Sequence, residues 1–106
     1  MTKVYYSAEG CYLHCQGHAG AGTEGTDIVC AGISALTLAL LNVLIEESER
    51  DHISLEYKAL PGELVIKAVP HTAYYGREIG NYFRVTLTGL RAIEQEHPEH
   101  ITMEEV

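Results

Sequence analysis

Short stretches in which hydrophobic and polar residues alternate recur along this chain, and a period of two residues predicts β-strands. The predicted strands are residues 4–6, 11–16, 53–57 and 63–68. Glu9 and Gly10 separate the first two strands, and Pro61 and Gly62 separate the second two, with Pro-Gly being typical of a tight turn. The pattern therefore predicts two β-hairpins.

Two longer stretches follow a helical pattern. Residues 28–45 contain no charged residue and come directly after Asp27, a favourable N-cap, so a helix is expected to run from there to about Arg50. Apolar residues spaced by three and four predict a second helix over residues 72–96, which Pro98 ends. Because the first helix is apolar nearly all round, it is predicted to be the central element of the fold.

The order of these elements predicts an α+β fold in which two helices pack on a largely antiparallel sheet of four to five strands. The order is β-β-α-β-β-α, with a further short strand expected over residues 100–103. The chain has 106 residues, of which 46% are hydrophobic, which is enough to form the core of one domain. We therefore expect residues 1–106 to form a single domain.

Charge and cysteine content narrow the range of possible partners and cellular compartments. Fifteen acidic residues against seven basic ones give a net charge of -8, which argues against an indiscriminate grip on nucleic acid or an anionic membrane and favours a basic partner. Three cysteines fit no disulfide framework, and the first residues read as a strand rather than a signal peptide. A cytoplasmic protein with free thiols is expected.

The uncharged stretch 28–45 is also long enough to be considered as a membrane span. Polar residues interrupt it, acidic residues flank it on both sides, and no Lys/Arg cluster is present to orient it. These features favour a core helix of a globular protein, so no membrane partner is expected.

The candidate catalytic residues lie where a glycine-rich loop meets the first helix. Cys30 is the third residue after Asp27, and the unpaired N–H groups of a first helical turn favour the thiolate, the nucleophilic form. His18 stands at the other end of the loop, which is long enough to fold back and bring the imidazole to the sulfur as a general base and acid. The same N–H groups could receive the oxyanion of a tetrahedral intermediate.

Simpler interpretations exist for each residue. A cysteine on a core helix is commonly a small buried hydrophobic side chain, and a loop histidine is commonly solvated. Asp27 is a helix cap by preference, although it could also orient His18. Spacing alone does not decide between these interpretations.

One string of residues resembles a known family. Gly17-His18-Ala19, followed after a short loop by Gly25-Thr26-Asp27-Ile28-Val29-Cys30-Ala31-Gly32-Ile33-Ser34, resembles the bacterial ribosomal-processing cysteine proteases, the Prp family. The resemblance is specific over residues 17–34 and looser over the rest of the chain.

The resemblance implies a cytoplasmic homodimer that removes a short N-terminal extension from a large-subunit ribosomal protein. It implies His18 and Cys30 as the catalytic dyad and Asp27 as a supporting residue. The residues that it implies for the substrate loop are Gly17, Ala19, Gly20, Gly22 and Gly25. It implies no cofactor.

Three other functions compete with a cysteine protease for this sequence. Residues 20–25 spell G-x-G-x-x-G, but Glu24 would repel a pyrophosphate and a hairpin follows instead of a parallel strand, which argues against nucleotide binding. Cys11, His14, Cys15 and His18 could suggest a metal site, but in a strand His14 and Cys15 point to opposite faces, so no metal is expected. A noncatalytic ribosome-assembly factor that holds a basic ribosomal protein fits the charge as well as a protease does.

Overall fold

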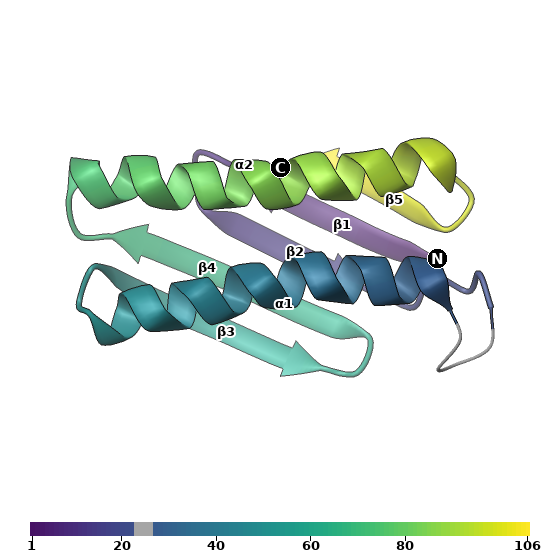
Figure 1. The fold of residues 1–106 in the computed structure, drawn as a ribbon, viewed down its shortest axis with the longest axis horizontal. Helices are drawn as coiled ribbons and strands as arrows, with labels where there is room; N and C mark the ends of the chain where they lie inside the picture. The colour runs from purple at the N-terminus through teal and green to yellow at the C-terminus, as the bar shows by residue number, and fades with distance from the viewer. Residues whose placement is uncertain (23–26) are drawn as a thin grey trace.

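The computed structural model describes residues 1–22 and 27–106. Seven elements follow one another in these residues (Figure 1). They are β1 (Thr2–Ser7), β2 (Tyr12–Gln16), α1 (Ile28–Glu49), β3 (Ile53–Leu60), β4 (Glu63–Pro70), α2 (Ala73–Glu96) and β5 (Ile101–Glu105). The predicted order of elements is confirmed.

The five strands form one sheet in the order β3-β4-β2-β1-β5. All neighbours pair antiparallel except β1 and β5, which pair parallel. The last strand can run parallel to the first because α2 carries the chain back across the sheet before β5 begins. The sheet is therefore mixed, with one parallel pair added to the antiparallel arrangement.

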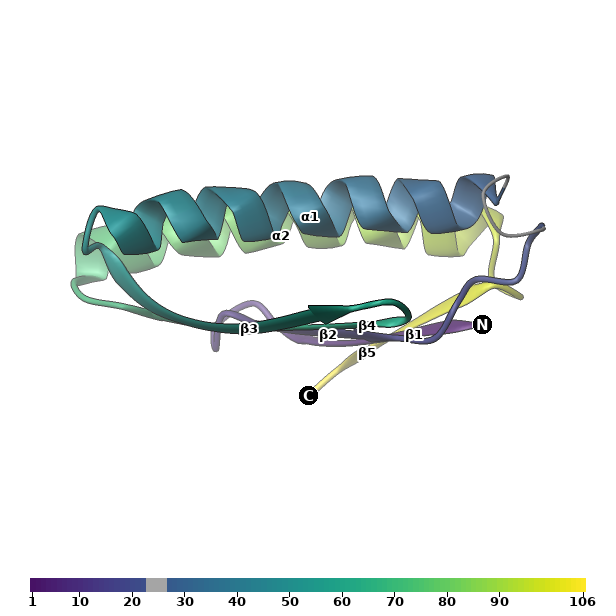
Figure 2. The ribbon, with the colours of Figure 1, turned by 90° about the horizontal axis from the view of Figure 1, so that it is seen from below.

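Both helices lie on the same face of the sheet, and its other face is open (Figure 2). Inward-facing strand residues alternate with outward-facing ones, so Val4, Leu13 and Ile66 are fully buried beneath the helices. The helices contribute Leu44 and Phe83 to the same core. This two-layer packing buries the apolar side of each element against the other layer.

Both helix starts agree with the capping signals. Asp27 caps α1, and the Thr72 side chain accepts the N–H of Tyr75 at the start of α2. Arg50 is the C-cap of α1, as its pattern predicts, and α2 ends at Glu96 just before His97 and Pro98.

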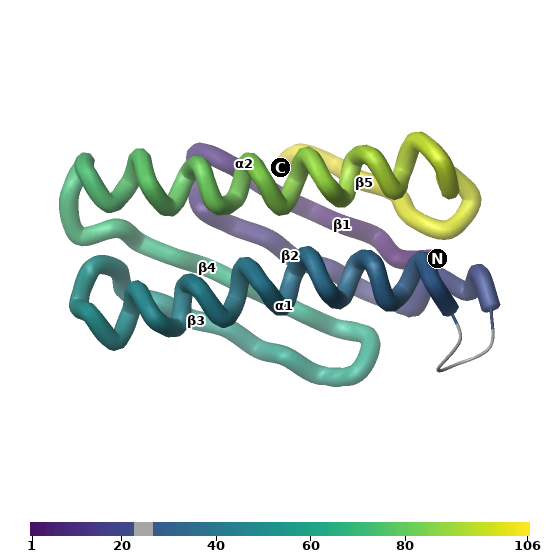
Figure 3. Tube along the Cα trace, in the orientation of Figure 1, coloured from purple at the N-terminus to yellow at the C-terminus, as the bar shows by residue number. Residues whose placement is uncertain are grey.

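The prediction that α1 is the central element is wrong. The trace in Figure 3 shows α1 beside α2, lying over β3 and β4 at one side of the sheet. Val29, Ile33 and Leu44 are buried, whereas Ala35 and Leu38 are exposed. Among the described residues α1 has the length and composition that a membrane span would need, and here it packs on the sheet and on α2 as a core helix.

Candidate active site

Cys30 lies in the first turn of α1, and the cap of that helix sets its position. Asp27 Oδ1 accepts the N–H of Cys30 at 2.9 Å, and the Asp27 carbonyl oxygen accepts the N–H of Ala31 at 3.0 Å. The Cys30 side chain is half-buried against the core. The helix therefore presents the thiol from a fixed backbone at its N-terminal end.

Asp27 also ties the preceding loop to the helix. Its second carboxylate oxygen accepts the N–H of Ala21 at 3.0 Å. Hydrogen bonds from backbone N–H groups, foremost that of Cys30, lower the pKa of Asp27 because they stabilise the carboxylate. In the described part of the chain, no hydrogen bond or ion pair joins Asp27 to His18. The carboxylate thus acts as the cap of α1 and as an anchor for Ala21.

The cap also bears on the predicted oxyanion site, which consists of N–H groups in the first turn of α1. The N–H groups of Cys30 and Ala31 already donate to Asp27, through its side chain and its carbonyl oxygen respectively. The cap holds the N–H of Cys30 and the first intrahelical bond holds that of Ala31, and reception of the oxyanion by first-turn N–H groups stays a prediction.

The backbone around His18 is tied to two distant segments. Gly17 donates its N–H to the carbonyl oxygen of Gly62 at 2.8 Å. On the other side, Ala19 is buried and its carbonyl oxygen accepts a hydrogen bond from Nδ1 of His100 at 3.0 Å. These contacts hold His18 between the β3–β4 turn and the segment that leads into β5.

Gly17 is a position that only glycine can fill. Its φ is +93°, and a Cβ there would lie 2.5 Å from the carbonyl oxygen of Met1. Such an approach to backbone leaves no room for any side chain. Glycine therefore lets the chain turn closely past the start of β1 and deliver His18.

The His18 side chain is exposed and lies against Gly62. A Cβ on Gly62 would lie 3.0 Å from His18 Nε2, and the φ of Gly62 is +75°. Because Gly62 has no side chain, the imidazole of His18 has room to lie against the turn.

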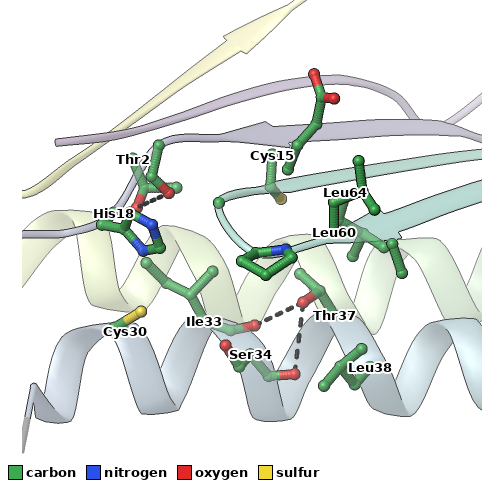
Figure 4. A pocket seen from close by; sticks show the side chains of 15 residues that line it. Thr2, Cys15, His18, Cys30, Ile33, Ser34, Thr37, Leu38, Leu60 and Leu64 are labelled. Atoms are coloured by element: carbon green, nitrogen blue, oxygen red, sulfur yellow. Dashed lines mark hydrogen bonds between the residues drawn. The ribbon is translucent and has the colours of Figure 1, made fainter. Parts of the chain in front are cut away.

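Two cavities of about 260 and 410 Å³ meet at the candidate dyad. His18, Cys30 and Ser34 line both of them. Figure 4 shows the first cavity from close by, with the His18 ring coming from the loop after β2 and the Cys30 sulfur from the first turn of α1. The fold therefore brings the two predicted catalytic residues to one hollow in the surface.

No hydrogen bond joins His18 to Cys30 within the residues that the structure describes. Catalytic hydrogen bonds are often long in an enzyme without substrate and tighten only in the complex. In the free protein, His18 and Cys30 therefore line the same cavities.

The first cavity is mainly apolar. Its apolar walls come from α1 and from the β3–β4 hairpin, and they include Ile33, Leu38, Leu60 and Leu64. Cys15 also lines it, and burial raises the pKa of the Cys15 thiol to about 12. Cys15 therefore stays a neutral thiol, and of the two cysteines at this cavity Cys30 is the one that can act as a nucleophile.

The second cavity involves the glycine loop. Gly20 and Gly22 line it together with Asp27, His18 and Cys30. Gly25, also predicted for the substrate loop, lies outside the described residues. Contact of this loop with a substrate stays a prediction.

Sequence reasoning missed two residues of this site. Ser34 follows Cys30 by four positions, so the helical repeat places both on one face, and this spacing could have revealed it. Gly62 gives no such signal, because its contact with His18 joins segments that are far apart in the chain.

The structure also bears on the metal site and the nucleotide site that the sequence suggested. Leu13 and Cys15 face the core, whereas His14 faces the opposite side of the sheet and its Nε2 lies 3.3 Å from Glu63. In residues 1–22 and 27–106, no three His, Cys, Asp or Glu side chains are grouped as metal ligands. Part of the G-x-G-x-x-G stretch lies outside the described residues, and the strand after α1 is an edge strand that pairs antiparallel with β4.

The family model for the cysteine protease Prp matches residues 1–102. The chain belongs to the Prp family. As a member of the Prp family it is a cysteine protease. No curated protein matches the chain significantly.

Several solved structures share the fold over nearly the whole chain. The ribosomal processing protease Prp of Staphylococcus aureus, in complex with a covalently linked product peptide, matches with a TM-score of 0.80 and 26% identity, covering 99% of this chain and 97% of that one. The same protease with a substrate peptide gives a TM-score of 0.72 at 24% identity, with the same coverage. The Streptococcus mutans protein SMU.848 gives 0.66 at 24% identity, covering 99% of this chain and 91% of that one.

Proposed function

We propose that this protein removes the short N-terminal extension of a large-subunit bacterial ribosomal protein, with Cys30 as nucleophile and His18 as general base and acid. The observation that carries the proposal is the convergence of His18 and Cys30, from separate elements, on the same two cavities. The likeness to a ribosomal processing protease in complex with peptides supports it.

The proposed reaction proceeds through a thioester. His18 takes the proton of the Cys30 thiol, and the sulfur attacks the scissile carbonyl carbon to form a tetrahedral intermediate. His18 then gives the proton to the departing amine as the C–N bond breaks, which leaves an acyl group on Cys30. A water molecule, deprotonated by His18, hydrolyses the thioester and regenerates the thiol.

The lining of the cavities supports a particular kind of peptide. Apolar walls in the first cavity suit an apolar side chain next to the scissile bond, since its burial removes apolar surface from water. The net charge of -8 attracts a basic substrate protein. An extended peptide that places an apolar side chain between α1 and the β3–β4 hairpin fits both properties.

The loop residues Gly17, Ala19, Gly20, Gly22 and Gly25 are proposed to border the bound peptide. Gly20 and Gly22 support this role because they line the cavity that also contains His18 and Cys30. Asp27 supports the site by holding Ala21 and the first turn of α1 together.

A cytoplasmic homodimer is proposed as the working form. Three free cysteines suit a reducing compartment. Leu38 of α1 and Val85 of α2 are 45% and 67% exposed, and such side chains offer apolar surface that a second copy could cover.

Incubation with the ribosomal protein precursor, followed by intact mass measurement, tests the proposed function. Loss of one short N-terminal peptide is expected, and an unchanged precursor would contradict the proposal. Membership of a protease family favours this activity over the noncatalytic assembly factor, which would leave the precursor intact.

A further inference from the structure

The basic residues of this acidic protein are unevenly distributed. Of its seven Lys and Arg residues, Arg77, Arg84 and Arg91 lie on α2 at intervals of seven positions. Seven residues make about two helical turns, so the three side chains project from one face of α2. They are spread over about 21 Å along the helix axis. All three are exposed, and we call the helix face that they share the arginine face.

The rest of the arginine face is small or neutral. Residues at the neighbouring helical positions include Ala73, Tyr74, Gly80, Asn81, Thr88 and Gln95. Of the acidic residues of α2, Glu78 hydrogen-bonds Tyr74 and Glu96 borders α1. Glu94 lies three positions after Arg91, at the edge of the arginine face, where its carboxylate accepts the N–H of Met103. The carboxylate at the edge of the arginine face is therefore engaged by the backbone of β5.

Acidic groups of neighbouring elements border this face, but in the described part of the chain none forms an ion pair with it. Glu105 of β5 lines a cavity of about 450 Å³ with Arg84 and Arg91, and Glu9 lines an adjoining cavity of about 490 Å³ with Arg84. Within the described residues, none of the three guanidinium groups lies within 4.0 Å of a carboxylate. The polar contact of Arg91 is with the hydroxyl of Tyr6, over whose ring it also lies.

The chemistry of the face indicates what it would bind. Protein interfaces depend on clusters of buried aromatic or aliphatic anchors, whereas the exposed aromatic side chain beside the arginines is Tyr74, which hydrogen-bonds Glu78. A symmetric contact with a second copy through the same face would bring arginines against arginines. A row of guanidinium groups with flanking hydroxyl and amide side chains instead suits successive phosphates, which arginine binds with paired hydrogen bonds.

We propose that the arginine face of α2 binds the phosphate backbone of single-stranded RNA. The choice of RNA over DNA rests on the proposed function, since a ribosomal substrate brings the enzyme close to RNA. The net charge of -8 opposes nucleic acid over the rest of the surface, so the contact is confined to this face and is weak and salt-sensitive. Such a contact would hold the protease beside RNA without using the catalytic cavities.

Fluorescence anisotropy with a labelled single-stranded RNA oligonucleotide tests the proposal on the full-length protein. Three phosphate contacts predict a slope of roughly -2 for log K against log salt, so raising salt from about 50 to about 200 mM should weaken binding roughly 15-fold. The double variant Arg77→Glu, Arg84→Glu should bind about tenfold more weakly or worse. Lys3→Glu changes an exposed cation on the open face of the sheet and should bind RNA as the wild type does.

Several outcomes would overturn the proposal. These are no RNA binding at about 50 mM salt, or equal losses in Lys3→Glu and the arginine variant. Tighter binding of polyglutamate than of RNA would assign the face to an acidic protein instead. Cleavage of the precursor by the arginine variant is measured separately, so failure of the RNA proposal and failure of the protease proposal are distinguishable.

Discussion

Gly62 and His18 are in direct contact, and this contact shapes the active site. A Cβ on Gly62 would lie 3.0 Å from Nε2 of His18, and the carbonyl oxygen of Gly62 accepts the N–H of Gly17 at 2.8 Å. The β3–β4 turn thus holds both the backbone before the histidine and its ring. The hairpin that borders the apolar cavity is also the support of the proposed general base.

Gly62→Ala should lower kcat/KM at least about tenfold. The new methyl group pushes the imidazole away, and the backbone strain at φ +75° costs about 1 kcal/mol. Gly10→Ala in the β1–β2 turn is a control, because its methyl group meets Ser7 and not His18. Peptide cleavage and thermal unfolding of both variants are the measurements, and equal activity of the two variants would refute a positioning role for Gly62.

Cys30→Ala should abolish cleavage and leave the fold intact, because it removes the nucleophile and only one sulfur atom. Cys30→Ser should be nearly as inactive, since a hydroxyl does not form the anion that attacks. Cys11→Ala removes a buried thiol away from both cavities and should keep activity. Turnover of either Cys30 variant at the wild-type rate would exclude Cys30 as the nucleophile.

His18→Ala should reduce kcat about 10²- to 10⁴-fold through the loss of general acid-base catalysis. Its thermal stability should change little, because the side chain is exposed. Kinetics and a melting curve separate the two effects. A variant that unfolds while its thiol reactivity is unchanged would show that His18 has a structural role only.

Alkylation of the folded protein at neutral pH should modify one of the three cysteines. Burial raises the pKa of Cys15 to about 12 and also raises that of Cys11, and both side chains are buried. Intact mass after iodoacetamide should show one adduct on the folded protein, lost in Cys30→Ala, and three adducts in denaturant. Two or three adducts on the folded protein would contradict this assignment.

Asp27→Ala should destabilise the protein at neutral pH and much less in acid. Because the folded pKa of Asp27 is lowered, its contribution is present above the ordinary aspartate pKa of about 3.9 and is lost as pH falls through the folded value. Melting temperatures of wild type and variant should converge below about pH 4. Asp27→Asn keeps an acceptor for the helix N-terminus and should lose less; a pH-independent gap for Asp27→Ala would argue against the carboxylate cap.

Local patterns in the sequence determined the elements of this fold. The helical repeat, the cap at Asp27 and the Pro61-Gly62 turn act between residues that are near neighbours in the chain, so they predicted both helices and both hairpins. The same local reading identified Cys30 at a helix start and, through a resemblance, His18. The hydrophobicity of α1 does not indicate how many of its sides other elements cover. The prediction that α1 is the central element was therefore wrong.

Contacts between distant segments were decided by the tertiary structure. Gly62 meets His18 only because the β3–β4 turn folds beside the end of β2, and Cys30 and His18 share cavities only because α1 lies over that hairpin. The whole-chain charge likewise concealed the arginine face, since a sum over residues carries no direction. Sequence patterns report neighbours along the chain, whereas side chains from separate elements meet according to how the layers pack.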